Sequence, residues 1–377
     1  MELAQETHKG KTIGELTVPS IIPLARQAAA EGIVLLKNKH NILPLKQEQL
    51  ISVFGRTALD YFTVGYGSGG DVRTPYKTNL MDGLARQNVN VNKELYKTYK
   101  NWVEKPEHKP GSYEWGQWPR SFPEMPLESE TVKKAAQKSE LALVVFGRAA
   151  GEARENVLEE GGFYLTNQEK LLLNQVTEYF DNVVVVLNCG NIIDLSWLEH
   201  YGDKIDALLY AGLGGMEGGN GAAEVLVGKR NPSGRLPATI ADTYESYPSA
   251  GHFGKSDFTE YVEDVYVGYR YFETFAQDKV LFPFGFGLSY TSFSWSSAVE
   301  VEGTDFSLDV EVENTGDKPG KEVVQVYLSA PQGKLGQPNW QLAAFEKTKE
   351  LQPGEKQTLQ LKLDLRSFAA YDDSGVT

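Results

Sequence analysis

The sequence contains a single cysteine, Cys189, among 377 residues. One thiol cannot form an internal disulfide, and because Cys189 follows the apolar run Val183 to Leu187 we predict a packed thiol. Histidine is also scarce, and its five positions lack the short spacing of metal ligands. These positions are His8, His40, His108, His200 and His252. We therefore predict no metal ion and no cofactor.

Basic residues and long apolar runs are also lacking. The chain has 37 Lys and Arg against 51 Asp and Glu, a formal charge of -14, and a pI near 5.0. Such a surface repels phosphates, which excludes nucleic acid as a partner. No stretch approaches the roughly 18 apolar residues of a membrane span, and Met1 to Gly14 is polar, unlike a secretory signal. We predict a cytoplasmic protein, or a piece of one, with no membrane partner.

Residues 20–245 alternate short apolar runs with helical patterns, which is typical of an α/β fold with a mostly parallel sheet covered by helices. The stretch Ile21 to Leu36 opens this domain with small and apolar residues at helical spacing. Short runs, apolar on both faces, predict buried strands. The predicted strands are Ile51 to Phe54, Leu141 to Phe146, Val183 to Leu187 and Ile205 to Tyr210. Residues 1–19 are an N-terminal extension.

Each predicted strand is followed by a loop that contains glycine. These loops are Gly55 to Gly70, Gly147 to Gly151, Gly190, and Gly212 to Gly219. In open α/β sheets the ligand crevice lies at the carboxyl ends of the strands, so we expect the four loops to converge on one site. Residues 95–130 look irregular, and their Tyr113, Trp115 and Trp118 are either sugar-stacking residues or variable decoration.

The pattern changes after residue 245. Residues 246–291 form an aromatic-rich connection, and residues 292–377 alternate apolar and polar positions as strands do. Predicted strands are Phe306 to Val312, Glu322 to Leu328 and Lys356 to Leu363, with turns at Asn314 to Gly316 and Pro353 to Glu355. This pattern indicates a β-sandwich. Only about five strands fit, whereas an immunoglobulin-type sandwich has about seven, so we expect its closing strands to be missing and its edge to need a partner segment.

Glu152 is the candidate catalytic residue. It follows the strand Leu141 to Phe146 and a glycine-bearing turn, so its carboxylate should project into the crevice, where a general acid must lie. The loop continues through Arg154, Glu155, Glu159 and Glu160 to a predicted helix cap, Thr166, and a predicted helix from Gln168 to Tyr179. Composition alone also fits a solvated acidic loop.

The glycine-rich stretch Gly65 to Gly70 lacks the Lys and Ser or Thr that end a phosphate loop, and Asp71 follows it. A phosphate site is therefore excluded. Its Ser68 could bond a neutral polyol, and a flexible turn is the alternative.

An ordered series of motifs closely resembles glycoside hydrolase family 3. The motifs are Glu31-Gly-Ile-Val-Leu-Leu-Lys-Asn38 with Leu43-Pro-Leu45, Gly67-Ser-Gly69, Gly147-Arg to Gly151-Glu152, Asn231-Pro-Ser-Gly-Arg-Leu-Pro237, Tyr266-Val-Gly-Tyr-Arg-Tyr271, Phe284-Gly-Phe-Gly-Leu-Ser-Tyr290, Asn314-Thr-Gly316 and Glu322-Val-Val-Gln-Val-Tyr327. The resemblance runs from about residue 7 to residue 377. It implies an α/β-sandwich domain at residues 20–245 and a fibronectin type III-like domain at residues 292–377.

The resemblance also implies roles for single residues. Family members are mainly retaining β-glucosidases, and many place the acid/base glutamate in the Gly-Glu loop, which here gives Glu152. The serine of the Gly-Ser-Gly loop, here Ser68, touches the sugar in similar enzymes, and we predict Arg154 as a second substrate-binding residue. The common Gly-Glu-Gly-x-Asp-Arg pattern is not kept, since Ala153, Glu155 and Asn156 stand there instead. Glu152 remains in place, and the leaving-group preference stays open.

A retaining glycosidase needs a second carboxylate roughly 5 Å from the first. In the family this nucleophile is an aspartate on a (β/α)₈ barrel, and the sequence contains no eightfold repeat that could form one. We expect the barrel on a following segment or a second chain, as in the family's permuted members. Two alternatives remain open: a non-catalytic carbohydrate-binding or assembly module, and a β-xylosidase or N-acetylglucosaminidase of the same family.

Overall fold

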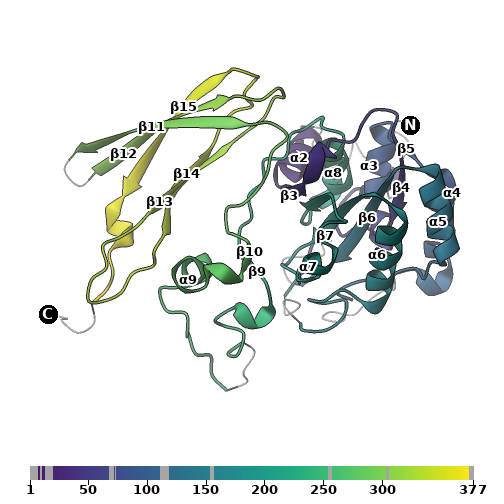
Figure 1. Ribbon diagram of the computed structural model, residues 1–377, viewed down its shortest axis with the longest axis horizontal. Coiled ribbons are helices and arrows are strands. Elements are labelled where there is room, and N and C mark those ends of the chain that lie inside the picture. Colours follow the sequence, from purple (N-terminus) through teal and green to yellow (C-terminus); the bar gives the residue numbers. More distant parts are fainter. Residues whose placement is uncertain are drawn as a thin grey trace. The chain divides into compact units, whose positions relative to one another are not determined.

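The computed structural model describes residues 7–8, 11–12, 20–67, 72, 74–110, 119–152, 157–253, 257–302 and 305–372. The chain forms two compact units, Met1–Gly234 and Arg235–Thr377 (Figure 1). A short antiparallel pair, β1 (Thr7–His8) with β2 (Lys11–Thr12), belongs to the first unit. Over these described ranges, no helix has both the length and the apolar character needed to cross a bilayer.

The first unit contains a six-stranded sheet with the order β3-β8-β7-β6-β4-β5. Its strands are β3 (Val34–Asn38), β4 (Leu50–Phe54), β5 (Asn90–Val91), β6 (Leu141–Arg148), β7 (Asn182–Cys189) and β8 (Ala207–Tyr210). All neighbours run parallel except β3, which pairs antiparallel with β8. All eight residues of β6 are buried, as expected for a strand covered on both faces. The predicted α/β class and the four predicted strands are confirmed.

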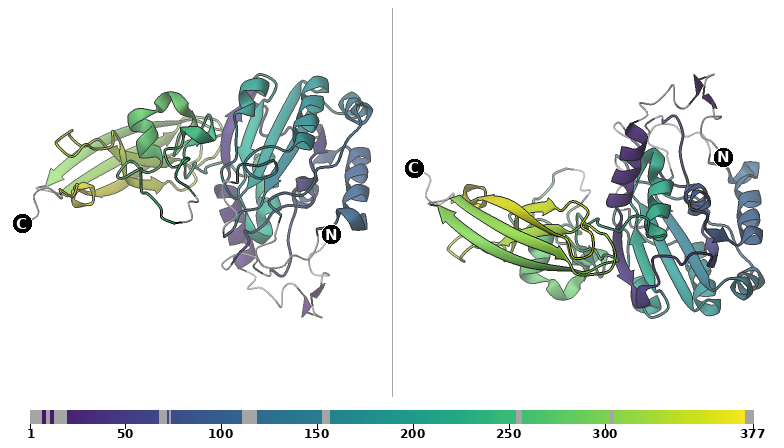
Figure 2. Two further views of the ribbon diagram at one scale, coloured as in Figure 1. Left: turned by 90° about the horizontal axis from the view of Figure 1, so that it is seen from below. Right: turned by 90° about the horizontal axis from the view of Figure 1, so that it is seen from above.

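Two groups of helices accompany this sheet. The helices of the unit are α2 (Ile21–Glu31), α3 (Leu80–Arg86), α4 (Lys93–Val103), α5 (Ser129–Lys138), α6 (Asn167–Tyr179), α7 (Trp197–Tyr201) and α8 (Gly218–Leu226). Helix α8 packs against α2 and α3, and α5 packs against α6 (Figure 2). The predicted cap of α6 is confirmed, because the Thr166 hydroxyl accepts a hydrogen bond from the Glu169 amide in a capping box.

Two expectations for this unit were wrong. The helical pattern from Ile21 does not reach Leu36, because α2 ends at Glu31 and β3 begins at Val34. Gly32 follows α2, and β-branched Ile33 and Val34 favour the strand that pairs with β8. The stretch from residue 95 is not irregular throughout, since α4 continues to Val103 with Leu95 and Tyr99 buried on one face.

The second unit begins with a connection that has its own small core. Strands β9 (Ile240–Ala241) and β10 (Val280–Phe282) pair antiparallel, and α9 (Tyr269–Phe275) lies between them in the sequence. The Phe272 ring of α9 is buried against Tyr247 and Ala276. The aromatic residues of the connection therefore form a packed subdomain core.

The remainder of the second unit is a β-sandwich of two antiparallel sheets. One sheet has the order β11-β12-β15 and comprises β11 (Phe293–Glu302), β12 (Asp305–Asn314) and β15 (Lys356–Asp364). The other sheet comprises β13 (Val323–Leu328) and β14 (Gln341–Lys347). The core between them is built from Val310, Val312, Val324, Leu351, Leu359 and Leu361. The predicted sandwich and its three predicted strands are confirmed.

One strand of the sandwich has an uncovered inner face. Trp295 of β11 stands opposite Val312 of β12, and Val299 stands opposite Leu308. Directly paired residues point to the same side of a sheet, yet Val312 is 0% exposed while Trp295 is 55% and Val299 is 63% exposed. Among the described residues, β13 and β14 pair only with each other. The second sheet is therefore too narrow to cover β11.

Candidate active site

Asn188, near the end of β7, connects the loops that follow β4 and β8 at the carboxyl ends of the parallel strands. Its side chain is fully buried, and its Oδ1 accepts a hydrogen bond from the Phe62 amide at 2.7 Å. Its Nδ2 donates to the Phe62 carbonyl at 2.9 Å and to the Gly212 carbonyl at 2.7 Å. The loops after β4 and β8 meet again where the Gly215 amide donates to the Thr63 carbonyl at 2.8 Å. The predicted convergence of these loops is confirmed.

The loop that carries Glu152 is joined to the loop after β4 through main-chain atoms. The Tyr66 amide donates to the Ala150 carbonyl at 2.7 Å, and the Glu152 amide donates to the Tyr66 carbonyl at 3.2 Å. Tyr66 and Gly151 thus form a parallel bridge between the two loops. The Glu152 side chain is exposed. The structure therefore places this carboxylate at the edge of the sheet where the strand-end loops meet.

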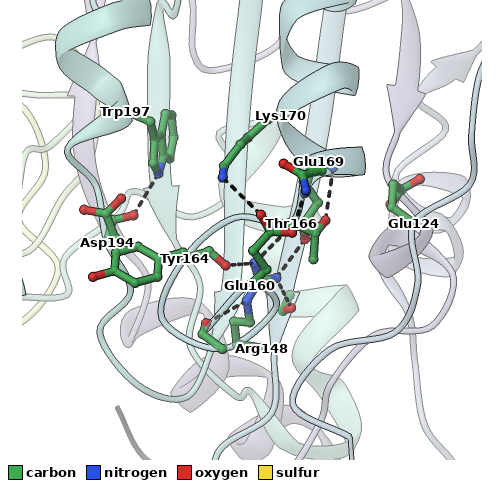
Figure 3. A network of polar contacts seen from close by, with 12 residues as sticks. Glu124, Arg148, Glu160, Tyr164, Thr166, Glu169, Lys170, Asp194 and Trp197 are labelled. Carbon is green, nitrogen blue, oxygen red and sulfur yellow. Dashed lines mark hydrogen bonds and ion pairs between the residues drawn. The ribbon is translucent and has the colours of Figure 1, made fainter. Parts of the chain in front are cut away.

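Arg148, the last residue of β6, points toward Glu169 at the start of helix α6 (Figure 3). Its guanidinium donates to both carboxylate oxygens of Glu169, at 2.8 and 2.7 Å. It also donates to the carbonyls of Gly162 at 2.9 Å and Tyr164 at 3.0 Å. Because Arg148 and Glu169 are both buried, this pair fixes the main chain at Gly162 and Tyr164, just before helix α6.

Glu159 and Glu160, two of the acidic residues that follow on this loop, have cationic partners, whereas Glu155 lies outside the described residues. Glu159 accepts a hydrogen bond from Arg120 at 2.8 Å, and Glu160 lies 3.6 Å from Lys170. The Arg120 carbonyl in turn accepts from the Ala149 amide at 2.7 Å. Glu159 and Glu160 therefore each form a surface ion pair with a basic residue, Arg120 and Lys170 respectively.

Several predicted residues lie outside the described part of the chain. These are the predicted substrate-binding residues Ser68 and Arg154 and the aromatic residues Tyr113, Trp115 and Trp118. Gly67, the neighbour of Ser68, is described and lies against Glu152. Their predicted roles stay predictions.

A cleft of about 300 Å³ opens beside Tyr66. Aromatic, amide, ammonium and carboxylate groups line it, the mixture that small polar ligands require. Its lining includes Asp60, Tyr61, Tyr66, Lys77, Asn79 and Phe122. The sequence pattern did not indicate Lys77, Asn79 and Phe122, because these residues come from two separate segments, one before α3 and one before α5, that only the fold brings to the cleft.

Comparison with known proteins decides the family. Residues 33–290 match the glycosyl hydrolase family 3 C-terminal domain, and residues 322–376 match a fibronectin type III-like domain. The chain belongs to glycosyl hydrolase family 3. The described residues of this family 3 chain contain the sheet, the helices and the sandwich, but no (β/α)₈ barrel.

Two curated relatives with high identity are β-glucosidases. The chain is 44% identical over 353 residues to a β-glucosidase of Ruminococcus albus, covering 94% of this chain and 37% of that protein. It is 39% identical over 397 residues to β-glucosidase A of Butyrivibrio fibrisolvens, covering 94% and 47%. The chain therefore spans less than half the length of these curated relatives.

Solved structures agree with this family assignment. A β-glucosidase from Paenibacillus barengoltzii superposes with a TM-score of 0.92 at 48% identity, covering 95% of this chain and 40% of that one. The β-glucosidase 3B of Thermotoga neapolitana in complex with glucose superposes with a TM-score of 0.86 at 33% identity, covering 96% and 51%. Both matches extend over most of this family 3 chain.

Two further ionisable groups of this family 3 chain lie buried close to the strand ends. Cys189 is buried, which confirms the predicted packed thiol, and this burial raises the pKa of the thiol to about 12. Glu124 is also buried, and this desolvation raises the pKa of its carboxyl to about 7. Its oxygens accept from the amides of Arg56 at 2.8 Å and Met125 at 3.0 Å. Glu124 thereby connects the segment before α5 to the end of β4.

Proposed function

We propose that this chain is part of a retaining, exo-acting β-glucosidase that hydrolyses terminal β-glucosides, with Glu152 as general acid/base. The observation that supports this most strongly is the position of Glu152. Its carboxylate is exposed at the carboxyl edge of the sheet, on a loop whose main chain is bonded to Tyr66. A general acid must reach the leaving oxygen of its substrate, and this exposed edge permits that approach.

The proposed reaction has two steps. First, an aspartate on a (β/α)₈ barrel attacks the anomeric carbon, the bond from that carbon to the glycosidic oxygen breaks, and protonated Glu152 gives its proton to the departing oxygen. Second, the Glu152 carboxylate takes a proton from water as the water oxygen displaces the aspartate from the anomeric carbon. Two inversions give net retention, and Glu152 returns to its protonated form.

Substrate contacts on this chain are part of the same proposal. Ser68 and Arg154 are proposed to bind the substrate, because each is close in sequence to the site. Ser68 directly follows Gly67, and Arg154 is two residues after Glu152. The cleft beside Tyr66 is proposed to receive the group that leaves with the protonated oxygen. Support comes from Tyr66 itself, which both lines the cleft and bonds to the Glu152 amide.

The proposed partners are a barrel segment and a strand-forming segment. The barrel would carry the nucleophile, in a following segment or in a second chain. The strand would pair with β13 and cover Trp295 and Val299 of β11, since exposed apolar faces and unpaired strand edges promote association. A cytoplasmic location stays a prediction from the sequence.

A substrate panel tests the proposed function. Residues 1–377 would be joined to a (β/α)₈ barrel of family 3 and assayed on aryl β-glucoside, β-xyloside and N-acetyl-β-glucosaminide. We expect kcat/KM for the glucoside to exceed the others by at least about tenfold, with a β-configured product in the first minutes by NMR. An α-configured product contradicts the retaining mechanism, and a preference for another sugar contradicts the proposed substrate. Binding without turnover supports a carbohydrate-binding module instead.

A further inference from the structure

The loop of Glu152 is held between two glycines of neighbouring loops. On one side, a Cβ atom placed on Gly67 would lie 2.6 Å from the Glu152 Cβ and 3.0 Å from its amide nitrogen. On the other side, a Cβ atom on Gly190 would lie 2.4 Å from the Ala150 Cβ. Real Cβ atoms do not approach so closely, so any side chain at either position must displace the loop between them.

We propose that Gly67, Tyr66 and Gly190 are positioning residues that clamp the main chain of Glu152, so that the neighbouring loops set where its carboxylate lies. This inference rests on the proposed role of Glu152 as general acid/base. None of the three residues needs to touch the reacting atoms. They act by fixing the residue that does.

Main-chain hydrogen bonds hold every second residue from Arg148 to Glu152. The Arg148 carbonyl accepts from the Gly190 amide at 3.3 Å, and the Ala150 carbonyl accepts from the Tyr66 amide at 2.7 Å. The Glu152 amide then donates to the Tyr66 carbonyl at 3.2 Å. The main chain before Glu152 is therefore fixed from both sides, while its side chain stays exposed.

Glycine is required at position 67 for two separate reasons. Its φ of +100° lies in a region that residues with a Cβ avoid. In addition, the space that a Cβ would occupy is filled by Glu152 itself. The backbone strain of a side chain at position 67 would lower stability, whereas its contact with Glu152 would displace the catalytic carboxylate. A displacement of about 1 Å in a catalytic group can cost about 100-fold in rate.

Gly67→Ala separates these two effects when it is compared with a matched control. Gly354 also has a positive φ, +78°, but nothing lies within 4 Å of its missing Cβ. Gly354→Ala therefore carries the backbone strain without displacing Glu152. Both variants would be made in the enzyme that joins residues 1–377 to a family 3 barrel, and thermal unfolding would verify folding.

The assay compares two leaving groups. Cellobiose needs a proton on its departing oxygen, whereas 2,4-dinitrophenyl β-glucoside does not. For Gly67→Ala we expect kcat/KM on cellobiose to fall at least about 30-fold and kcat/KM on the dinitrophenyl substrate to fall less than about threefold. Gly354→Ala should change both by less than about twofold. Equal losses on the two substrates for Gly67→Ala would overturn the proposal.

A double variant shows whether Gly67 acts through Glu152. If it does, Glu152→Ala with Gly67→Ala loses no more activity on cellobiose than Glu152→Ala alone. Additive losses would overturn the clamp while leaving the role of Glu152 intact. An unaltered cellobiose rate in Glu152→Ala alone would instead overturn the proposed function.

Gly190→Ala provides a second route if Gly67→Ala does not fold. Gly190 has no positive φ, so its new methyl group would cause little backbone strain. It would press on Ala150 at 2.4 Å and on the flexible end of the Leu213 side chain at 2.8 Å. We expect the same selective loss on cellobiose, of at least about tenfold. A loss that is equal on both substrates, or no loss at all, would overturn the proposal.

Discussion

Arg148 and Glu169 form a doubly hydrogen-bonded ion pair, with Nη1 to Oε1 at 2.8 Å and Nη2 to Oε2 at 2.7 Å. Arg148 ends β6 and Glu169 lies in the first turn of α6, so the pair joins the two ends of the loop that carries Glu152. Glu169 also accepts from the Thr166 amide at 2.8 Å, which completes the cap of α6. The Glu169 carboxylate thus both caps helix α6 and pairs with Arg148 at the end of β6.

Removal of Arg148 should therefore destabilise the first unit strongly. Arg148→Met leaves the Glu169 carboxylate buried without its cation, and such a loss typically costs about 3–5 kcal/mol. Urea unfolding would measure the change. As a control, Lys134→Met removes an exposed pair with Glu130 at 3.7 Å, and less than about 1 kcal/mol is expected. Similar values for the two variants would contradict a structural role for the Arg148 pair.

The loop junction at Asn188 predicts a second destabilised variant. Asn188→Ala removes the partners of the Phe62 amide, the Phe62 carbonyl and the Gly212 carbonyl at once. Each buried polar group left unpaired costs about 1–3 kcal/mol, so a total near 3 kcal/mol or more is expected in urea unfolding. Asn182→Ala, which loses one exposed bond to the Glu140 carbonyl, should cost less than about 1 kcal/mol. A neutral Asn188→Ala would show that these loops are held by other contacts.

Strand and helix patterns in the sequence predicted the sheet well, because β4, β6, β7 and β8 are short apolar runs between turn signals. They did not predict β3, which is an antiparallel edge strand only three residues after α2. Apolar residues at helical spacing continue into this strand, and periodicity cannot separate the two. Strand β5, two residues long, is too short to give any pattern.

The site was predicted in part. Glycines after each strand indicated where the loops converge, and the position of Glu152 followed from the end of β6. No local pattern marks Asn188 or Glu124 as contacts of this region, because their partners lie far along the chain. The bonds that Tyr66 makes to Ala150 and Glu152 involve only main-chain atoms, which the side-chain sequence does not specify.

Glu124 predicts a pH dependence of stability. Burial, with a further contribution from the Glu169 charge, raises the pKa of the Glu124 carboxyl from 4.5 to about 7. Between these values the folded state keeps a proton that the unfolded state loses, so stability falls as pH rises through this window. The stability that the protonated Glu124 carboxyl contributes to the folded state is fully present below pH 4.5 and is lost above pH 7. Over this whole pH window the free energy of unfolding falls by about 3 kcal/mol because of Glu124.

Urea unfolding at pH 5 and pH 8 would measure this effect in the parent chain and in Glu124→Gln. The glutamine cannot ionise, so its loss of stability between the two pH values should be smaller by about 2–3 kcal/mol. The other ionisable groups are common to both proteins, so they do not contribute to the difference between them. An identical pH dependence would show that Glu124 titrates normally in the folded state.

The uncovered face of β11 predicts self-association of the chain when the proposed strand-forming segment is absent. Trp295→Thr with Val299→Thr should lower light scattering of concentrated protein, while stability changes by less than about 1 kcal/mol, because both side chains are exposed. The control is Val312→Thr, at the buried ladder partner of Trp295. It should cost about 1–3 kcal/mol without lowering the scattering. Unchanged scattering in the double variant would contradict an adhesive face.

Glu152→Ala in the enzyme joined to a family 3 barrel tests the central claim most directly. The measurement is kcat/KM on cellobiose beside kcat/KM on 2,4-dinitrophenyl β-glucoside, with the exposed Glu140→Ala variant as control. If Glu152 is the general acid/base, the cellobiose value falls by at least about 100-fold and the dinitrophenyl value by less than about threefold. Cellobiose turnover that stays within about threefold of the parent enzyme contradicts the assignment.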